Sequence, residues 1–319
     1  METWQEIFKT SLKNHADLES YFDRSFAKTS YPVFIPLPLA KKIKILGPDS
    51  ALARQFLPHI DENLATGLVD PIGDHKRLVG GQLIHRYHNR ALFLPTSICP
   101  VQCRYCFRKN ELHSNDEMFK NEQSEIVKYL NSHPEIEEVI FTGGDPFILS
   151  NEKLLEYLKM FEQTPIKYLR FHSRTPVIIP QRIDNGLLEV LDLATKHFKR
   201  VHLAIHINHM TEMDDLFFEK IKMLQKTSVE LLSQTVLLKD VNDNVEYLLL
   251  LFKQLMEFGI RPYYLHHPDK VKGGMHFYLE TTIGRKIYSE LRQNLPGWAL
   301  PQYVIDNAEG TGKTEVMSC

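Results

Sequence analysis

Six short apolar runs, each followed at once by polar residues, constrain the fold of this 319-residue chain more than any other feature. The runs span residues 91–94, 138–141, 168–171, 201–205, 229–232 and 261–265. Amphipathic stretches of helical length lie between them, at residues 152–161, 186–197, 214–225 and 245–258. Alternating strands and helices predict a parallel α/β fold. Six units rather than eight predict an open, partial (β/α)6 barrel, with its chemistry at the carboxyl ends of the strands.

The polar residues after the first run include three cysteines in a C-x3-C-x2-C pattern: Cys99, Cys103 and Cys106. Three thiolates can bind three irons of a [4Fe–4S] cluster and leave the fourth iron open, whereas clusters that only carry electrons usually have four cysteines. A zinc site would need a fourth ligand, and His113 has no partner at a suitable spacing. With Cys319 as the only other cysteine, no disulfide framework is expected. The pattern therefore predicts a cluster with one open iron.

Composition excludes several classes of protein. The chain is 43% hydrophobic and 24% charged, with a formal net charge of −2, as is typical of a globular protein. A near-neutral charge argues against a nucleic-acid-binding surface. The longest apolar stretches, such as residues 247–252, are too short to span a bilayer, and the N-terminus lacks the apolar region of a signal peptide. We therefore expect a cytoplasmic protein with neither a nucleic-acid nor a membrane partner.

Three regions are expected along the chain. Residues 1–90 are predicted to form a mainly helical N-terminal extension, residues 91–295 the barrel, and residues 296–319 a C-terminal segment. That segment contains Lys313 in a glycine-rich loop, but it is not a phosphate-binding P-loop, because position 307 is Asn and too little chain follows for a helix. A lysine in such a loop can form a Schiff base with an aldehyde cofactor, pyridoxal phosphate (PLP). Taken alone, the segment fits a solvated tail at least as well.

The cysteine pattern, with Tyr105 before its last cysteine, resembles the signature of the radical S-adenosylmethionine (SAM) enzymes. Gly143-Gly144-Asp145, at the end of the second apolar run, is the second mark of that family. The resemblance implies that SAM binds the open iron and is cleaved to a 5′-deoxyadenosyl radical. It also implies that Gly143, Gly144 and Asp145 contact the methionyl amine of SAM. Without the cysteines, these three residues would indicate only a turn.

The whole chain resembles the lysine 2,3-aminomutase family of radical SAM, PLP-dependent enzymes. The similar motifs lie at residues 85–90, 99–106, 143–145, 172–176, 206–209, 233–243 and 264–277, and at the Lys313 loop. The chain looks most like the short bacterial branch that supplies β-lysine to elongation factor P. His266 agrees with that branch, whereas the context of Asp306 is more like that of the fermentative enzymes. The resemblance implies no structural zinc, with Cys319 as a free thiol.

The resemblance also assigns cofactor-binding roles to individual residues. Lys313 matches the lysine that holds PLP as a Schiff base. Arg86 and Arg90 match the residues that bind the PLP phosphate, a task that suits the planar donor fork of arginine, and Tyr87 would pack beside them. Three residues match positions that contact SAM: Tyr105, His206 and Gln234.

Three further residues match the substrate site. Arg108 matches the residue that binds the substrate carboxylate, and Asp269 and Asp306 match two carboxylates that receive the side-chain ammonium of lysine. Two buried carboxylates are costly without a cation, so the pair favours a diamino acid as substrate. Each aspartate on its own would equally fit a loop cap or a surface charge.

The activity implied by the resemblance is a 1,2-amino shift that converts L-lysine to β-lysine, as the R enantiomer if the branch assignment holds. The implied partners are a reductant such as flavodoxin or ferredoxin, and elongation factor P with its ligase; a homo-oligomer is left open. Three alternatives remain at this level. They are a 2,3-aminomutase for another amino acid, a radical SAM enzyme without PLP, and a non-catalytic iron–sulfur protein.

Overall fold

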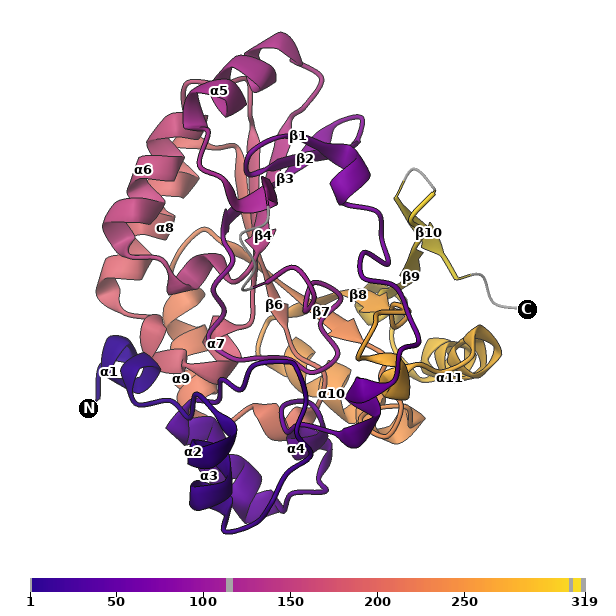
Figure 1. Cartoon of the computed structure of the whole chain (residues 1–319). Coiled ribbons are helices and arrows are strands. Elements are labelled where there is room, and N and C mark those ends of the chain that lie inside the picture. Colours follow the sequence, from indigo (N-terminus) through magenta and orange to yellow (C-terminus); the bar gives the residue numbers. More distant parts are fainter. Residues whose placement is uncertain (1, 113–116, 310–311, 317–319) are drawn as a thin grey trace.

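A computed structural model describes residues 2–112, 117–309 and 312–316. Its centre is a ten-stranded sheet in which the strands follow one another in chain order from β1 to β10 (Figure 1). Neighbouring strands from β3 to β9 are parallel, and the two edges of the sheet, β1–β2 and β10, are antiparallel to their neighbours. The strands are β1 (Leu78–Gly80), β2 (Leu83–Tyr87), β3 (Arg90–Thr96), β4 (Glu138–Gly143), β5 (Tyr168–Ser173), β6 (Arg200–His206), β7 (Glu230–Val236), β8 (Arg261–His266), β9 (Gln302–Asp306) and β10 (Lys313–Glu315).

Helices connect the parallel strands and also form the N-terminal region. The α-helices are α1 (Trp4–Lys9), α2 (His15–Phe22), α3 (Leu37–Leu46), α4 (Ala51–Arg54), α5 (Gln123–Ser132), α6 (Asn151–Phe161), α7 (Thr175–Ile178), α8 (Asn185–His197), α9 (Asp215–Leu224), α10 (Val245–Glu257) and α11 (Thr281–Asn294). Short 3-10 turns are η1 (Ile60–Asn63), η2 (His75–Arg77), η3 (Glu117–Phe119), η4 (Pro146–Ile148), η5 (Pro180–Arg182), η6 (Met210–Glu212), η7 (Met275–Phe277) and η8 (Gly297–Ala299).

The predicted parallel α/β partial barrel is confirmed. All six apolar runs form parallel strands, β3 to β8, and the four predicted helices correspond to α6, α8, α9 and α10 within a residue or two at each end. Polar side chains fix where these helices begin, because Ser150, Asp184, Asp214 and Asn244 each accept a hydrogen bond from a backbone N–H of the first turn.

Three parts of the sheet were not predicted: strand β9, the short strand β10 that pairs with it, and the hairpin β1–β2. Strand β9 adds a seventh parallel strand next to β8, in the region expected to be a separate C-terminal segment. Residues 78–87, within the region expected to be mainly helical, form the hairpin β1–β2 and pair with β3. The glycines between β1 and β2 could have indicated the turn, since Gly81 has a φ of +42° and a side chain there would meet the backbone oxygen of Lys120.

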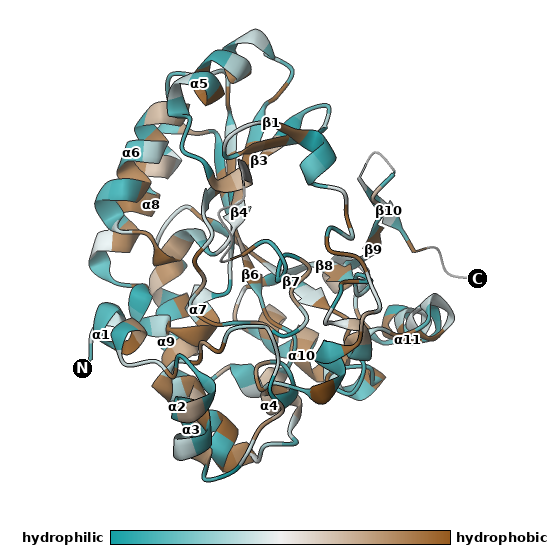
Figure 2. Cartoon of the chain, in the orientation of Figure 1, coloured by the Kyte–Doolittle hydropathy of each residue, from teal (hydrophilic) through white to brown (hydrophobic). Residues whose placement is uncertain are grey.

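The main hydrophobic core lies between the parallel strands and the helices outside them, and it includes Phe93, Phe141, Phe171, Leu203 and Leu265. Hydrophobic and hydrophilic residues alternate along α6 and α8, as expected for helices with one buried face (Figure 2). Helices α1–α4 gather at one end of the molecule and enclose a second, smaller core. Among the described residues, none of the helices has the length and apolar character needed to cross a bilayer.

Candidate active site

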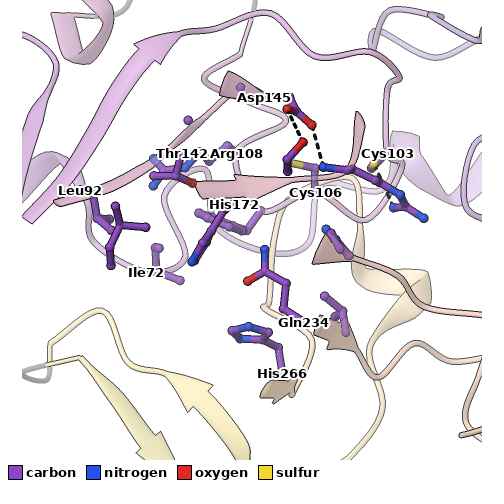
Figure 3. A pocket seen from close by; sticks show the side chains of 18 of the residues that line it. Ile72, Leu92, Cys103, Cys106, Arg108, Thr142, Asp145, His172, Gln234 and His266 are labelled. Carbon is purple, nitrogen blue, oxygen red and sulfur yellow. Dashed lines mark hydrogen bonds between the residues drawn. The ribbon is translucent and has the colours of Figure 1, made fainter. Parts of the chain in front are cut away.

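A single cavity at the carboxyl ends of the parallel strands is lined by all of the residues predicted to bind the cluster, the cofactors or the substrate. Figure 3 labels some of them, including Cys103, Arg108 and Gln234. It encloses about 1460 Å³, part of which is open to solvent. The predicted residues that line it are Arg86, Tyr87, Arg90, Cys99, Cys103, Tyr105, Cys106, Arg108, Gly143, Gly144, Asp145, His206, Gln234, Asp269, Asp306 and Lys313. Because these residues come from segments far apart in the chain, the fold brings one candidate site together. Their individual roles remain predictions.

The segment after β3, residues 97–108, carries the three cysteines and is called the cysteine loop below. Burial raises the pKa of all three thiols. Cys106 and Cys103 raise the pKa of Cys99 further, and burial followed by Cys103 raises that of Cys106 to about 12. Thiols this close together need a cation to become thiolates, which is what a metal cluster supplies. The donor set therefore fits the predicted iron–sulfur cluster. His113 and Cys319 lie outside the described residues.

Arg174 directly follows strand β5 and contacts the cysteine loop. Its Nη1 donates to Cys103 Sγ at 3.1 Å, and its Nη2 donates to Gln55 Oε1 at 2.8 Å and Glu212 Oε2 at 2.7 Å. The guanidinium is buried. Burial raises the pKa of the Cys103 thiol, and the positive charge of Arg174 lowers it. Sequence reasoning named the motif around Arg174 but gave this residue no role, because its partners come from three separate segments.

The Gly143-Gly144-Asp145 motif packs directly against the cysteine loop. A side chain on Gly144 would come within 2.3 Å of the backbone oxygen of Ile98, and Asp145 N donates to that same oxygen at 2.8 Å. The Asp145 carboxylate accepts hydrogen bonds from Ser173 Oγ (2.7 Å) and from the backbone N–H groups of Phe147, Arg174 and Thr175 (3.0, 2.7 and 2.9 Å). In this structure Asp145 thus joins the loops after β4 and β5, while its predicted contact with SAM remains a prediction.

Tyr105 and His206, both predicted to contact SAM, contact each other. The Tyr105 hydroxyl lies 3.0 Å from His206 Nε2, which is also 3.2 Å from Asn208 Oδ1. Burial, then the nearby Arg174 charge, keep the pKa of His206 well below its usual value, so its imidazole is neutral. Gln234, on β7 beside His206, points into the cavity in Figure 3. This side of the cavity thus presents neutral hydrogen-bonding groups next to the cysteines.

The C-terminal hairpin β9–β10 brings Lys313 to the opposite side of the cavity. Lys313 Nζ lies 2.5 Å from Asp306 Oδ2 on the paired strand, and its backbone N donates to the Tyr87 hydroxyl at 2.8 Å. Gly312 is required here, because its φ is +133° and a side chain would meet the Tyr87 ring at 2.1 Å. The Gly310 and Thr311 part of the loop lies outside the described residues.

Arg86 and Arg90, which are predicted to bind the PLP phosphate, contact the same residues as Lys313, namely Asp306 and Tyr87. The Arg90 guanidinium stacks 3.7 Å from the centre of the Tyr87 ring. Arg86 donates to the backbone oxygen of Asn307 and pairs with Asp306 at 3.5 Å, but its buried Nε has no partner in the described part of the chain. A lysine amine, an aromatic ring and two arginines with a spare donor fit an aldehyde cofactor that carries a phosphate.

The predicted substrate residues lie in the same cavity. Burial, followed by the nearby Asp306 carboxylate, raises the pKa of Asp269 to about 7. The pKa of Asp306 is lowered, because Lys313 and other cations outweigh its burial. Arg108 pairs with Asp74 at 2.5 Å and lies 3.7 Å from Glu111, and its buried Nε lacks a partner among the residues described.

Sequence reasoning missed other residues that line the cavity. His172 stands at the end of β5 and points into it (Figure 3), and burial, followed by Arg170 and Lys313, lowers its pKa well below the usual value. The motif at residues 172–176 was noticed and could have indicated this. Asp74 does not follow any of the six apolar runs, so no pattern marked it as a partner of Arg108.

Comparisons with known proteins identify the family of this chain. The model of the radical SAM superfamily matches residues 93–251. The L-lysine 2,3-aminomutase of Escherichia coli (strain K12) is 38% identical over 279 residues, which is 86% of this chain and 80% of that protein. The L-lysine 2,3-aminomutase of Haemophilus influenzae is 33% identical, and the match covers 98% of this chain and 95% of that protein. The L-lysine 2,3-aminomutase of Clostridium subterminale is 33% identical, and the match covers 85% of this chain and 65% of that protein.

Among solved structures, coproporphyrinogen III oxidase from Escherichia coli matches 66% of this chain and 54% of its own, with a TM-score of 0.40 and 12% identity. The Haemophilus influenzae relative matches nearly the whole chain, and the match to the superfamily model includes the cysteine loop. Membership of the radical SAM superfamily implies a [4Fe–4S] cluster and SAM. The chain belongs to the L-lysine 2,3-aminomutase family of radical SAM enzymes and is an isomerase.

Proposed function

We propose that the protein uses PLP together with SAM and the cluster to convert L-lysine to β-lysine. The observation that carries the proposal is that two carboxylates, Asp269 and Asp306, share a cavity with Lys313 and the three cysteines. The cluster and SAM supply a radical, and PLP supplies an aldehyde and an electron sink. The chain itself has to place the substrate and exclude water and oxygen.

The charges around Asp306 favour a substrate with a second ammonium group. Lys313 is now the cation nearest to Asp306. If the amine of Lys313 is engaged by the PLP aldehyde, Asp306 loses that cation, and Asp269 has none within the described hydrogen bonds and ion pairs. Two buried carboxylates without a cation beside them are unfavourable in free energy. The side-chain ammonium of lysine, a compact charge with three donors, would offset that cost.

Arg108 is suited to the other end of the substrate. Asp74 and Glu111 hold its guanidinium from one side, and its unpaired Nε remains as a donor for a carboxylate. Arg86 and Arg90 are proposed to hold the PLP phosphate, with Tyr87 against the cofactor. Tyr105, His206 and Gln234 are proposed to hold SAM beside the cysteines. The three ligands would then meet in the middle of one cavity, where a hydrogen atom can be exchanged over a short distance.

We further propose that the product is the R enantiomer and serves elongation factor P through a separate ligase, with flavodoxin or ferredoxin as reductant. The support is the similarity of the motif at residues 264–266 to the elongation-factor branch. The cytoplasm, where these partners occur, is the proposed location.

The decisive experiment is anaerobic incubation of the protein with SAM, PLP, dithionite and L-lysine, followed by chiral analysis of the product. We expect (R)-β-lysine, formed only when all components are present. Product formation without PLP would indicate a radical SAM enzyme of another kind. Turnover of a different amino acid in preference to lysine would refute the substrate assignment, and no turnover of any amino acid would refute the proposed reaction.

A further inference from the structure

The two ends of the proposed substrate site come from loops that are far apart in the sequence. Arg108 is the last residue of the cysteine loop, and Asp269 follows strand β8. Both side chains line the same cavity. The separation between them decides how long a diamino acid must be to reach both. That separation depends on how firmly the two loops are held together.

Lys109, the neighbour of Arg108, connects these two loops. Its side chain is fully buried, and Nζ donates to Glu62 Oε2 at 3.1 Å, to the backbone oxygen of Arg104 at 2.8 Å and to that of Gly273 at 2.7 Å. These acceptors use all three N–H groups of the ammonium. Gly273 belongs to the loop that carries Asp269, so a single side chain joins that loop to the cysteine loop.

Backbone hydrogen bonds brace the loop of residues 269–274, which carries both Asp269 and Gly273. Within the loop, Val271 N donates to the backbone oxygen of Asp269 at 2.8 Å, and Gly274 N donates to that of Val271 at 3.0 Å. Leu68 pairs with the outer side of the loop through two backbone hydrogen bonds of 2.8 and 2.9 Å. Such a loop moves as a unit rather than absorbing a displacement.

Tyr31 supports the same contact from the N-terminal region. Its hydroxyl donates to the backbone oxygen of Lys272 at 3.0 Å, and the Lys109 ammonium lies 3.8 Å from the centre of its ring. A side chain on Gly273, which has a φ of +76°, would meet the Tyr31 hydroxyl at 2.3 Å. The ring therefore leaves the loop little room to move toward or away from Lys109.

We propose that Lys109 is a positioning residue that fixes the distance between Arg108 and Asp269 and thereby selects diamino acids of the length of lysine. The inference rests on the proposed substrate. Ornithine, one methylene shorter, would reach only one of the two ends while the loops are joined. A looser connection would let the Asp269 loop approach and accept the shorter substrate.

The test compares lysine and ornithine in a Lys109→Met variant, in which the methionine keeps most of the apolar stem and removes the three donors. We expect the KM for lysine to rise more than kcat falls, and the ratio of kcat/KM for lysine over ornithine to fall by about tenfold or more, since one methylene is worth about 10–200-fold. Lys272→Met is the matched control, because Lys272 is exposed in the same loop. Lys272→Met should keep the parent's ratio of kcat/KM for lysine over ornithine.

A second measurement does not depend on turnover. Hydrogen exchange of the cofactor-loaded protein without substrate should be faster in residues 266–277 of Lys109→Met, and unchanged in the strands of the barrel. Tyr31→Phe, which removes only a hydroxyl, should shift both readouts in the same direction by less, and it carries the test if Lys109→Met does not fold. An unchanged substrate ratio, or unchanged exchange in residues 266–277, would overturn the proposal. A parent protein that does not use lysine would instead refute the proposed function.

Discussion

At the scale of single residues, the most informative contact is the one between Lys313 and Asp306. Lys313 Nζ lies 2.5 Å from Asp306 Oδ2, and Arg86 lies on the other side of the same carboxylate at 3.5 Å. A carboxylate proposed to bind the substrate ammonium is therefore also the partner of the lysine proposed to bind PLP. The two uses are compatible only if one cation replaces the other during the reaction.

Replacing Lys313 tests the proposed PLP site. Lys313→Ala should remove covalent attachment of PLP and all conversion of lysine, because no other amine takes its place in the hairpin. Reductive cleavage of SAM should persist, since the cysteines are on a different segment. Borohydride trapping followed by peptide mass analysis measures the attachment, with Glu315→Gln, an exposed change in the same strand, as control. Full attachment of PLP to the alanine variant would show that another residue holds it.

Replacing Asp269 tests the proposed substrate. Asp269→Asn should lower kcat/KM for lysine by two to three powers of ten, because a buried ammonium left under-paired costs about 3–5 kcal/mol. Iron content and PLP loading should stay at the parent's level. Asp243→Asn, at an exposed position, is the control. If Asp269→Asn uses lysine as well as the parent does, the ammonium is bound elsewhere.

The same aspartate predicts a pH dependence. Burial raises the pKa of Asp269 to about 7, so the free protein holds a neutral carboxylic acid below that pH and a carboxylate above it. Only the carboxylate pairs with an ammonium, so kcat/KM for lysine should rise with pH through about 7. The profile of kcat/KM reports groups of the free enzyme. Asp269→Asn should lose this rise, and its persistence in the variant would assign it to another group.

At the scale of elements, the contact between the end of β4 and the cysteine loop positions the cluster site. Gly144 has no space for a side chain, because the nearest atoms belong to the backbone of Ile98, which cannot move without the loop. Gly144 is thus explained by packing against the cysteine loop, whereas Gly143 has a φ of +97° and lies against Leu94 and Thr96 of strand β3. Strand β4 and the loop after β3 form one unit, although about forty residues separate them in the sequence.

Gly144→Ala should therefore displace the cysteine loop and lower the iron content after reconstitution, while the sheet still folds. We expect a loss of about 1–3 kcal/mol in stability, as is typical of overpacking. Gly297→Ala is a matched control, since a side chain there meets nothing within 4 Å. Iron analysis and thermal unfolding measure the two effects. Full iron content in Gly144→Ala would mean that the loop adapts.

At the scale of the whole molecule, the N-terminal region is joined to the barrel by buried charges. Glu62 accepts from Arg104 and from Lys109, and the side chains of all three are fully buried. Gln55 accepts from Arg174, which in turn contacts Cys103. The N-terminal region therefore completes the surroundings of the cysteine loop and is more than a covering layer.

Glu62→Gln should destabilise the whole protein, because it leaves the charges of Arg104 and Lys109 buried without a carboxylate. The expected cost is about 3–5 kcal/mol, seen as a lower midpoint of thermal unfolding. Glu219→Gln, an exposed change on α9, should leave the midpoint unchanged. A Glu62→Gln variant as stable as the parent would mean that Arg104 and Lys109 find other acceptors.

The sequence by itself determined the parallel α/β fold and the spacing of the three cysteines. Local patterns carry this information, because apolar runs form buried strands and parallel strands end at the same edge of the sheet. Most of the other candidate residues were named by the family resemblance, and His172 and Asp74 were missed. Strand β9 and the hairpin β1–β2 escaped this reasoning, because short strands at or near the edge of a sheet have weak local patterns.

Only the tertiary structure decided which charges meet. Three sets of contacts join segments that are distant in the chain. They are Arg108 with Asp74, Arg174 with Cys103 and Glu212, and Lys109 with Glu62 and the backbone oxygen of Gly273. No local propensity encodes such pairs, because each buried charge is stabilised by whichever partner the packing of several elements brings within hydrogen-bonding distance.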